Sequence, residues 1–176
     1  MDEKKRTLMV FVSAIVILIL SGWLLGKIGE RREREQTRIL LSQLLPQSQT
    51  FAEEELTSDA EHVTQAWRGE TGYVVETVMN GYVDDIVVWT ALDHEGTVTG
   101  VTIRTLHETW GLGRRALRDE EFLRQFLGTD GYAQIGYGID GLTGATVTSK
   151  AIARAINAAA AFVSGTDGLT EATEWG

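Results

Sequence analysis

The chain has 176 residues, a formal net charge of −9 and no cysteine. This length allows one ordinary domain and an anchor, and the missing thiols exclude disulfides, thiolate metal ligands and cysteine nucleophiles from the chain itself. Residues 1–38 hold 8 of the 16 basic and 5 of the 25 acidic side chains, so the remainder carries 8 basic and 20 acidic side chains and a charge of −12. Because so acidic a region repels a phosphate backbone, we expect no nucleic-acid partner.

Residues 7–26, TLMVFVSAIVILILSGWLLG, contain no charged side chain. About 20 apolar residues in a helix are enough to cross a hydrocarbon core of roughly 30 Å. The run leads into a charged segment without an A-x-A-like cleavage site, unlike a signal peptide. The sequence therefore predicts a retained transmembrane helix after a tail of residues 1–6. Lysine and arginine flank it on both sides, so the flanking charges leave its orientation open.

Residues 27–70 are predicted to form a helical stalk and a linker. Apolar residues recur at helical spacing before Pro46, at Ile39, Leu40, Leu44 and Leu45, and Pro46 is expected to stop the helix. Such a stalk could pack on a partner helix or dock onto the chain's own domain. Residues 47–70 are polar and acidic, which predicts a linker with a short helix.

A domain is expected over residues 71–165, beginning with β-structure. Residues 72–79, 84–93 and 97–107 are rich in valine, isoleucine, threonine and tyrosine, and a turn at His94-Glu95-Gly96 joins the last two segments. Strands that follow one another through short turns are most simply an antiparallel meander.

Two helices follow the predicted strands. Residues 114–128 have a helical apolar pattern at Leu117, Phe122, Leu123 and Phe126, which could cover one face of the sheet. The last helix is predicted over SKAIARAINAAAAFVSG, where Gly165 is placed to end it and one face is apolar, at Ile152, Ile156, Ala159, Ala160 and Val163. Separate blocks of strands and helices predict an α+β fold, with helices packed on a twisted antiparallel sheet. Residues 166–176 are predicted to be a mobile tail.

The stretch GIDGLTGATVTSKAIARAI, residues 138–156, gathers four hydroxyl residues at the entrance of the last helix, namely Thr143, Thr146, Thr148 and Ser149. Thr148 or Ser149 could cap the helix, with Gly141 and Gly144 forming the preceding turn. Alternatively, the unpaired N–H groups and the positive end of the helix dipole could bind a phosphate, with Lys150 adding charge. The residues alone leave both interpretations open.

The segment DGLTGATVTS is similar to the D-x-x-[ST]-G-A-T-x-[ST] flavinylation motif of the FMN-binding domain family. The matching positions are Asp140, Thr143, Gly144, Ala145, Thr146 and Thr148. The resemblance implies that a flavin transferase attaches FMN through a phosphoester to Thr146, and that Thr143, Gly144, Ala145 and Thr148 lie at the cofactor. Asp140 is then either read by the transferase or holds the turn.

A second segment, HETWGLG at residues 107–113, resembles the H-E-T-P-G-L-G segment of the same family. The resemblance implies that Glu108, Thr109, Leu112 and Gly113 contact the flavin. Trp110 stands where the family usually has proline, which alters the turn or offers an aromatic surface beside the flavin.

With its amino-terminal span, the chain resembles the G subunits of Rnf-type ion-translocating electron-transport complexes, which are related to the C subunits of the sodium-pumping NADH:quinone oxidoreductase. The resemblance implies an electron-transfer subunit with covalent FMN, partner subunits in a membrane redox complex, and no catalysis by the chain alone. It also implies a cytoplasmic amino terminus and a flavin domain on the outer side of the cell (inner) membrane.

No general-base pair or nucleophile dyad is evident in the sequence, and the histidines at 62, 94 and 107 show no metal-ligand spacing. We therefore expect neither catalytic residues nor a metal site. Two other functions stay open. The chain could be a stand-alone membrane-tethered flavoprotein electron carrier, or a non-redox membrane-tethered binding or scaffold domain.

Overall fold

The computed structural model describes residues 3–56, 60, 62–81, 84–106 and 119–166, with the backbone alone for residues 3–14, 105 and 106. The chain divides into two compact units, residues 1–40 and residues 41–176. The predicted mobile tail, 166–176, lies outside the described residues beyond Thr166.

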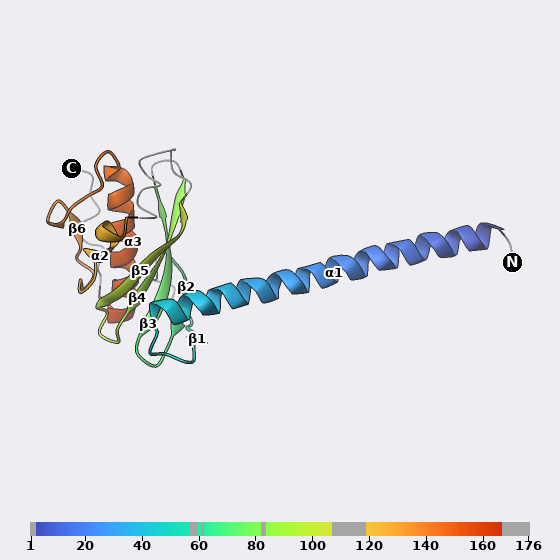
Figure 1. The fold of residues 1–176 in the computed structure, drawn as a ribbon, viewed down its shortest axis with the longest axis horizontal. Helices are drawn as coiled ribbons and strands as arrows, with labels where there is room; N and C mark the ends of the chain where they lie inside the picture. Colours follow the sequence, from blue (N-terminus) through green and yellow to red (C-terminus); the bar gives the residue numbers. More distant parts are fainter. Residues whose placement is uncertain (1–2, 57–59, 61, 82–83, 107–118, 167–176) are drawn as a thin grey trace. The chain divides into compact units, whose positions relative to one another are not determined.

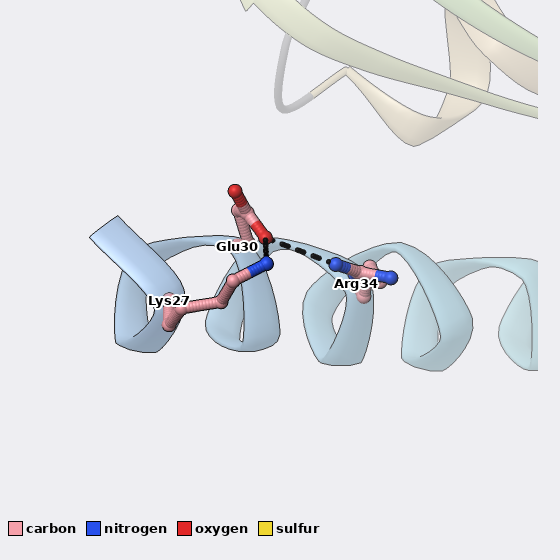
Figure 2. Close-up of polar contacts among 3 residues, drawn as sticks. All are labelled: Lys27, Glu30 and Arg34. Atoms are coloured by element: carbon pink, nitrogen blue, oxygen red, sulfur yellow. Dashed lines mark hydrogen bonds and ion pairs between the residues drawn. The ribbon is translucent and has the colours of Figure 1, made fainter. Parts of the chain in front are cut away.

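Helix α1 (Glu3–Leu44) supplies the described part of the first unit. It is continuous, as predicted for the amino-terminal helix and the stalk, and it ends two residues before Pro46. The Glu30 carboxylate accepts contacts from Lys27 Nζ at 3.3 Å and from Arg34 Nη2 at 3.1 Å (Figure 2). Such pairs at i,i+3 and i,i+4 stabilise an exposed helix by about 0.2–0.5 kcal/mol each.

In the part of the chain whose side chains are described, no helix combines the length and the apolar character needed to cross a membrane. The predicted span covers residues 7–26. For its first part, residues 7–14, the structure describes the backbone alone.

The second unit contains one antiparallel sheet in the order β1-β2-β3-β4-β5 (Figure 1). Its strands are β1 (Ala52–Glu53), β2 (Val63–Arg68), β3 (Tyr73–Asn80), β4 (Asp85–Leu92) and β5 (Val98–Leu106). Strands β3, β4 and β5 confirm the predicted meander.

The expectation of a linker with a short helix over residues 47–70 is wrong, because β1 and β2 lie in this segment. The pairing of β2 with β3 shifts register between Val63 and Gln65. This irregularity puts the buried residues of β2 at Val63, Ala66 and Trp67. A strand with such spacing lacks the strict alternation by which strands are recognised in a sequence.

The turn between β4 and β5 is held by Asp93. Its carboxylate accepts hydrogen bonds from the backbone N–H groups of Glu95 at 2.9 Å and Thr97 at 2.8 Å. Partial burial raises the pKa of Asp93, but the hydrogen bonds from Thr97 and Glu95 outweigh it, so the pKa lies below its ordinary value. The predicted turn at residues 94–96 is confirmed, and Gly96 supplies a φ of 91° there.

Helix α3 (Thr146–Ser164) covers one face of the sheet (Figure 1). The Thr77 hydroxyl of β3 donates to the Ala155 carbonyl of α3 at 3.1 Å, so this buried polar group is satisfied. As predicted, α3 ends at Gly165, which adopts φ 68° and donates to the Ala161 carbonyl. The core between sheet and helices includes Val75, Met79, Ile86, Val88, Leu92, Ile152 and Ile156.

Helix α2 (Glu120–Arg124) is shorter than the helix predicted over residues 114–128. Residues 114–118 lie outside the described residues. After Arg124 the N–H groups of residues 125, 126, 127 and 129 donate to carbonyls three residues earlier, whereas Gly128 N donates to Val98 O at 2.8 Å. Phe122 and Phe126 are buried, as predicted, and their rings meet edge to face at 5.3 Å. These two rings anchor the α2 segment in the core.

The sheet face opposite α3 carries an aromatic cluster formed by Trp67, Glu76, Trp89 and Arg104. The Trp67 and Trp89 rings lie 4.7 Å apart, and the Arg104 guanidinium lies 4.9 Å from the Trp89 ring centre. The Glu76 carboxylate accepts from Trp89 Nε1 at 2.6 Å and from the Thr64 hydroxyl at 2.6 Å. Side chains of β2, β3, β4 and β5 thus contact one another across this face of the sheet.

Between α2 and α3 the chain forms two short parallel strands, β6 (Gln134–Ile135) and β7 (Gly138–Ile139). This connection is fastened to α3 by Asn157, whose buried side-chain amide accepts from Ala133 N at 3.0 Å and donates to Ala133 O at 2.9 Å. Ala133, the residue before β6, is therefore held against α3.

Candidate functional site

The entrance of α3 is formed by residues 140–146, which we call the 140–146 turn. Thr146 is the first residue of α3, and its side chain is exposed. Ala145 occupies the N-cap position and makes no side-chain capping hydrogen bond. The predicted capping by Thr148 or Ser149 is wrong, because both lie inside α3 and are 2% and 0% exposed.

Ser149 stabilises the turn from within the helix. Its hydroxyl accepts from Leu142 N at 3.0 Å and donates to Ala145 O at 2.9 Å. One buried hydroxyl thus joins two residues of the turn to the first turn of α3. A serine side chain that bonds backward to the i−4 carbonyl is common in helices, but here the same oxygen also accepts from the preceding loop.

The beginning of the turn is held by Gln125, the residue after α2. Its side-chain amide accepts from Asp140 N at 2.7 Å and donates to Asp140 O at 3.3 Å. Both backbone groups of Asp140 are therefore satisfied by one side chain. The Asp140 carboxylate itself is on an exposed residue.

The two glycines of the turn have different reasons to be there. Gly144 has φ 78°, a conformation that side-chain-bearing residues rarely adopt. Gly141 lies close to β6, and a Cβ added to it would be 2.9 Å from Ile135 Cγ2. Gly144 therefore bends the chain, whereas Gly141 permits close packing.

A cavity of about 450 Å³ lies beside the turn. It is lined by Asp119, Glu121, Phe122, Gln125, Asp140, Gly141, Leu142 and Thr143. The cavity therefore extends from α2 to the turn, so that a group bound at the turn would have room along α2.

The entrance of α3 suits a phosphate group. A helix of 19 residues presents unpaired N–H groups and a partial positive charge at its first turn. No acidic side chain lies in this turn, and the exposed Lys150 follows in the next. Thr146 is exposed and is the first residue of α3, so a phosphate esterified to it would lie at this end of the helix, and the residues present would fit such a group.

The structure places the predicted residues of the flavinylation motif together at this entrance. Thr143, Gly144 and Thr146 are exposed, whereas Ala145 and Thr148 are buried. The second predicted set, Glu108, Thr109, Leu112 and Gly113, lies outside the described residues with Trp110. The structure therefore gives the positions of one half of the predicted site.

The sequence did not single out Gln125 and Asn157, and it gave Ser149 the wrong role. Each of these side chains binds a residue distant in the sequence. Gln125 binds a residue 15 positions away, Asn157 one 24 positions away and Ser149 one 7 positions away. Local spacing carries no signal for such pairs, because side-chain amides and hydroxyls occur at many surface positions. Among the described residues, no group of three or more His, Asp or Glu side chains is arranged to hold a metal ion.

Comparison with known proteins bears directly on this site. Residues 81–161 match the model of the FMN-binding domain. The chain is 33% identical over 95 residues to the G subunit of the Na⁺-translocating ferredoxin:NAD⁺ oxidoreductase complex of Acetobacterium woodii, in a match that covers 49% of this chain and 46% of that protein. It is 26% identical over 189 residues to the G subunit of the ion-translocating oxidoreductase complex of Methanosarcina acetivorans, covering 96% of this chain and 100% of that protein.

The chain thus spans about half the length of the Acetobacterium protein in the aligned region and all of the Methanosarcina protein. The matched residues 81–161 include β4, β5, α2 and the 140–146 turn. Residues 81–161 therefore match the FMN-binding domain, and the chain as a whole is similar to the G subunits of ion-translocating oxidoreductase complexes.

Proposed function

We propose that the chain is an electron-transfer subunit that carries FMN bound covalently to Thr146, within an ion-translocating oxidoreductase complex of the Rnf type. The observation that carries the proposal is the position of Thr146, an exposed hydroxyl on the first residue of α3, inside the region that matches the FMN-binding domain. The names of the two relatives support the assignment to such a complex.

The attachment chemistry requires an activated flavin nucleotide. Esterification by FMN itself would release water and is unfavourable in aqueous solution, so the donor must carry a phosphoanhydride, as a flavin dinucleotide does. The Thr146 oxygen forms a bond to the phosphorus on the flavin side, and the anhydride P–O bond breaks. The hydroxyl proton ends on the departing nucleoside monophosphate, and a flavin transferase would supply the acceleration.

The residues of the turn would then hold the cofactor. The first-turn N–H groups of α3 and Lys150 stabilise the phosphate, since both favour negative charge at this position. Thr143 and Gly144 lie open to the cofactor, while the small Ala145 and the buried Thr148 form the surface beneath it. Glu108, Thr109, Leu112 and Gly113 contribute from the other segment, and Asp140 is either read by the transferase or holds the turn. FMN supplies the acceptance and release of electrons, and the chain supplies position and electrostatics.

The membrane placement forms part of the proposal. Residues 7–26 span the membrane after a cytoplasmic tail, residues 27–70 lead to the domain, and residues 71–165 hold the flavin outside the cytoplasm, at the cell (inner) membrane. Partner subunits exchange electrons with the flavin, and the chain alone turns over no substrate. A covalent link suits this location, because a cofactor lost from the outer side cannot be recaptured from dilute solution.

Flavin attachment is tested by producing the full chain together with a flavin transferase. Denatured protein should fluoresce in a gel under ultraviolet light, and its intact mass should rise by one FMN group. Thr146→Ala should abolish both signals. Thr99→Ala is the matched control, because Thr99 is an exposed threonine of β5 outside the motif and its loss should leave the fluorescence in place.

Two results would contradict the proposal. A wild-type chain that stays colourless and unmodified beside an active transferase would favour a non-redox binding or scaffold domain. Equal fluorescence of Thr146→Ala and wild type would show that another residue is the acceptor. Copurification with polytopic subunits separates a member of a complex from a stand-alone carrier.

A further inference from the structure

We propose that Gln125 and Ser149 are positioning residues that hold the 140–146 turn in the conformation in which Thr146 accepts the flavin phosphate, and that they thereby set kcat/KM for flavin attachment. The inference rests on the proposed function. Ser149 follows the matched positions of the motif, and Gln125 lies outside its segment.

At the start of the turn, the Gln125 side chain makes the hydrogen bonds that a neighbouring strand would otherwise make. Its amide binds both the N–H and the carbonyl of Asp140, at 2.7 and 3.3 Å, which are the two backbone groups that a paired strand would bind. Asp140 follows β7 directly, so the hydrogen bonding continues for one more residue. Removing the amide leaves this residue without both interactions.

The Gln125 backbone is itself fixed. Phe122 and Phe126, which lie three residues before it and one after it, are 2% and 0% exposed. Gln125 N donates to the Phe122 carbonyl at 3.3 Å. Because the Phe122 and Phe126 rings pack in the core, the backbone of Gln125 is held in place. The Gln125 amide is therefore already ordered before another protein binds the turn.

Ser149 holds the end of the turn. Its hydroxyl binds Leu142 N and Ala145 O, and its backbone N–H also donates to Ala145 O at 2.9 Å. Thr143 and Gly144 lie between Leu142 and Ala145, the two residues that the Ser149 hydroxyl binds, and both are exposed. The left-handed φ of Gly144 lies within this short span, so these hydrogen bonds confine the bend that leads to Thr146.

The hydrogen bonds of Gln125 and Ser149 matter for the transfer step because the Thr146 hydroxyl must approach the phosphorus of the flavin donor in line. A turn that populates other conformations presents Thr146 correctly for only a fraction of the time. The apparent affinity of the transferase for the chain then falls by that fraction. Once the chain saturates the transferase, bound turns are all in the competent conformation and the maximal rate is retained.

The experiment measures flavin attachment to the full chain by a flavin transferase with a flavin dinucleotide as donor, at several chain concentrations. We expect Gln125→Ala and Ser149→Ala each to lower kcat/KM about fivefold to tenfold, through a higher KM for the chain and an unchanged kcat. Gln125→Glu, which keeps the acceptor for Asp140 N–H, should fall between wild type and Gln125→Ala.

Matched controls are available on the same chain. Gln65 is an exposed glutamine in β2 and Ser164 an exposed serine at the far end of α3. Gln65→Ala and Ser164→Ala should load at the wild-type rate. Hydrogen exchange on the flavin-free chain supplies an independent readout, in which the Asp140 amide should exchange faster in Gln125→Ala and the Leu142 amide faster in Ser149→Ala, with the amides of β3 and β4 unchanged.

Wild-type kcat/KM in both alanine variants would overturn the inference while leaving the proposed function intact. Slower loading accompanied by faster exchange throughout β3 and β4 would also overturn it, because the residues would then act on overall stability. If the wild-type chain accepts no flavin at all, the proposed function fails, and the exchange of the Asp140 and Leu142 amides still reports whether the two side chains order the turn.

Discussion

Glu76 is a residue whose single carboxylate joins β2 and β4 through Thr64 and Trp89. Glu76→Ala would leave the Trp89 N–H, on a side chain that is almost fully buried, without its acceptor. An unsatisfied donor of this kind costs about 1–3 kcal/mol. We expect Glu76→Ala to lower the free energy of unfolding of the flavin-free chain by that amount in urea titrations.

Glu76→Gln is the control for this prediction, because an amide oxygen can still accept from Trp89 and Thr64. It should lose less stability than Glu76→Ala. If the alanine variant unfolds at the same urea concentration as the wild type, the hydrogen bond does not contribute to stability.

Asn157 makes a comparable contribution between the 131–135 segment and α3. Asn157→Ala removes the partners of Ala133 N and Ala133 O. Because two buried backbone groups lose their partners, we expect a loss of about 2 kcal/mol or more in the free energy of unfolding. Chemical denaturation measures it, and a change below about 0.5 kcal/mol, the usual effect of a surface substitution, would refute the prediction.

At the level of elements, the β4–β5 hairpin should make stability depend on acidity. The pKa of Asp93 is lowered in the folded chain, so the stabilisation is fully present above the unfolded pKa of about 3.9 and is lost as pH falls through the folded pKa. Asp93→Asn abolishes this titration. The difference in unfolding free energy between wild type and variant should therefore be constant near neutral pH and shrink below about pH 4.

The wild type must be compared with Asp93→Asn because the pKa of Glu70 is also lowered in the folded chain. The hydroxyl of Thr50 and backbone N–H groups donate to its carboxylate and lower its pKa. Both chains keep Glu70, so its effect cancels. A difference between wild type and Asp93→Asn that is the same at all pH values would contradict the assignment to Asp93.

Elements with a regular pattern could be predicted from the sequence, and irregular ones could not. β3, β4 and β5 carry β-branched residues in consecutive runs, and α3 has a helical apolar face that ends at a glycine, so local physics identifies each of them. β2 was missed because a register shift at Val63 and Gln65 disrupts its pattern. Its place in the sheet depends on pairing with β3, which single-segment spacing does not reveal.

The same distinction holds at the candidate site. Thr146 could be placed at a helix entrance because the glycines and the following apolar face mark the start of α3. The roles of Ser149 and Gln125 could not be predicted, because they depend on where Leu142 and Asp140 lie after folding. The prediction that Thr148 or Ser149 caps the helix was wrong because α3 begins at Thr146, so both residues lie inside it.

For the whole molecule, the proposed topology can be tested by labelling, because the chain has no cysteine of its own. Tyr137→Cys places a thiol at a position that is 78% exposed in the second unit, and Lys5→Cys places one before the proposed span. In intact cells, a membrane-impermeant maleimide should label Tyr137→Cys and should reach Lys5→Cys only after the membrane is disrupted. The reverse pattern would place the flavin domain in the cytoplasm.

The contact between Trp67 and Trp89 has an optical consequence for the whole chain. Two indoles whose ring centres are 4.7 Å apart and whose planes are tilted by 38° share their excitation, so their coupled transitions should produce a paired positive and negative band in circular dichroism. Loss of this couplet on denaturation would report the separation of β2 from β4 without an added dye. Indole emission also overlaps flavin absorption, so quenching of that light could time the arrival of the cofactor during maturation.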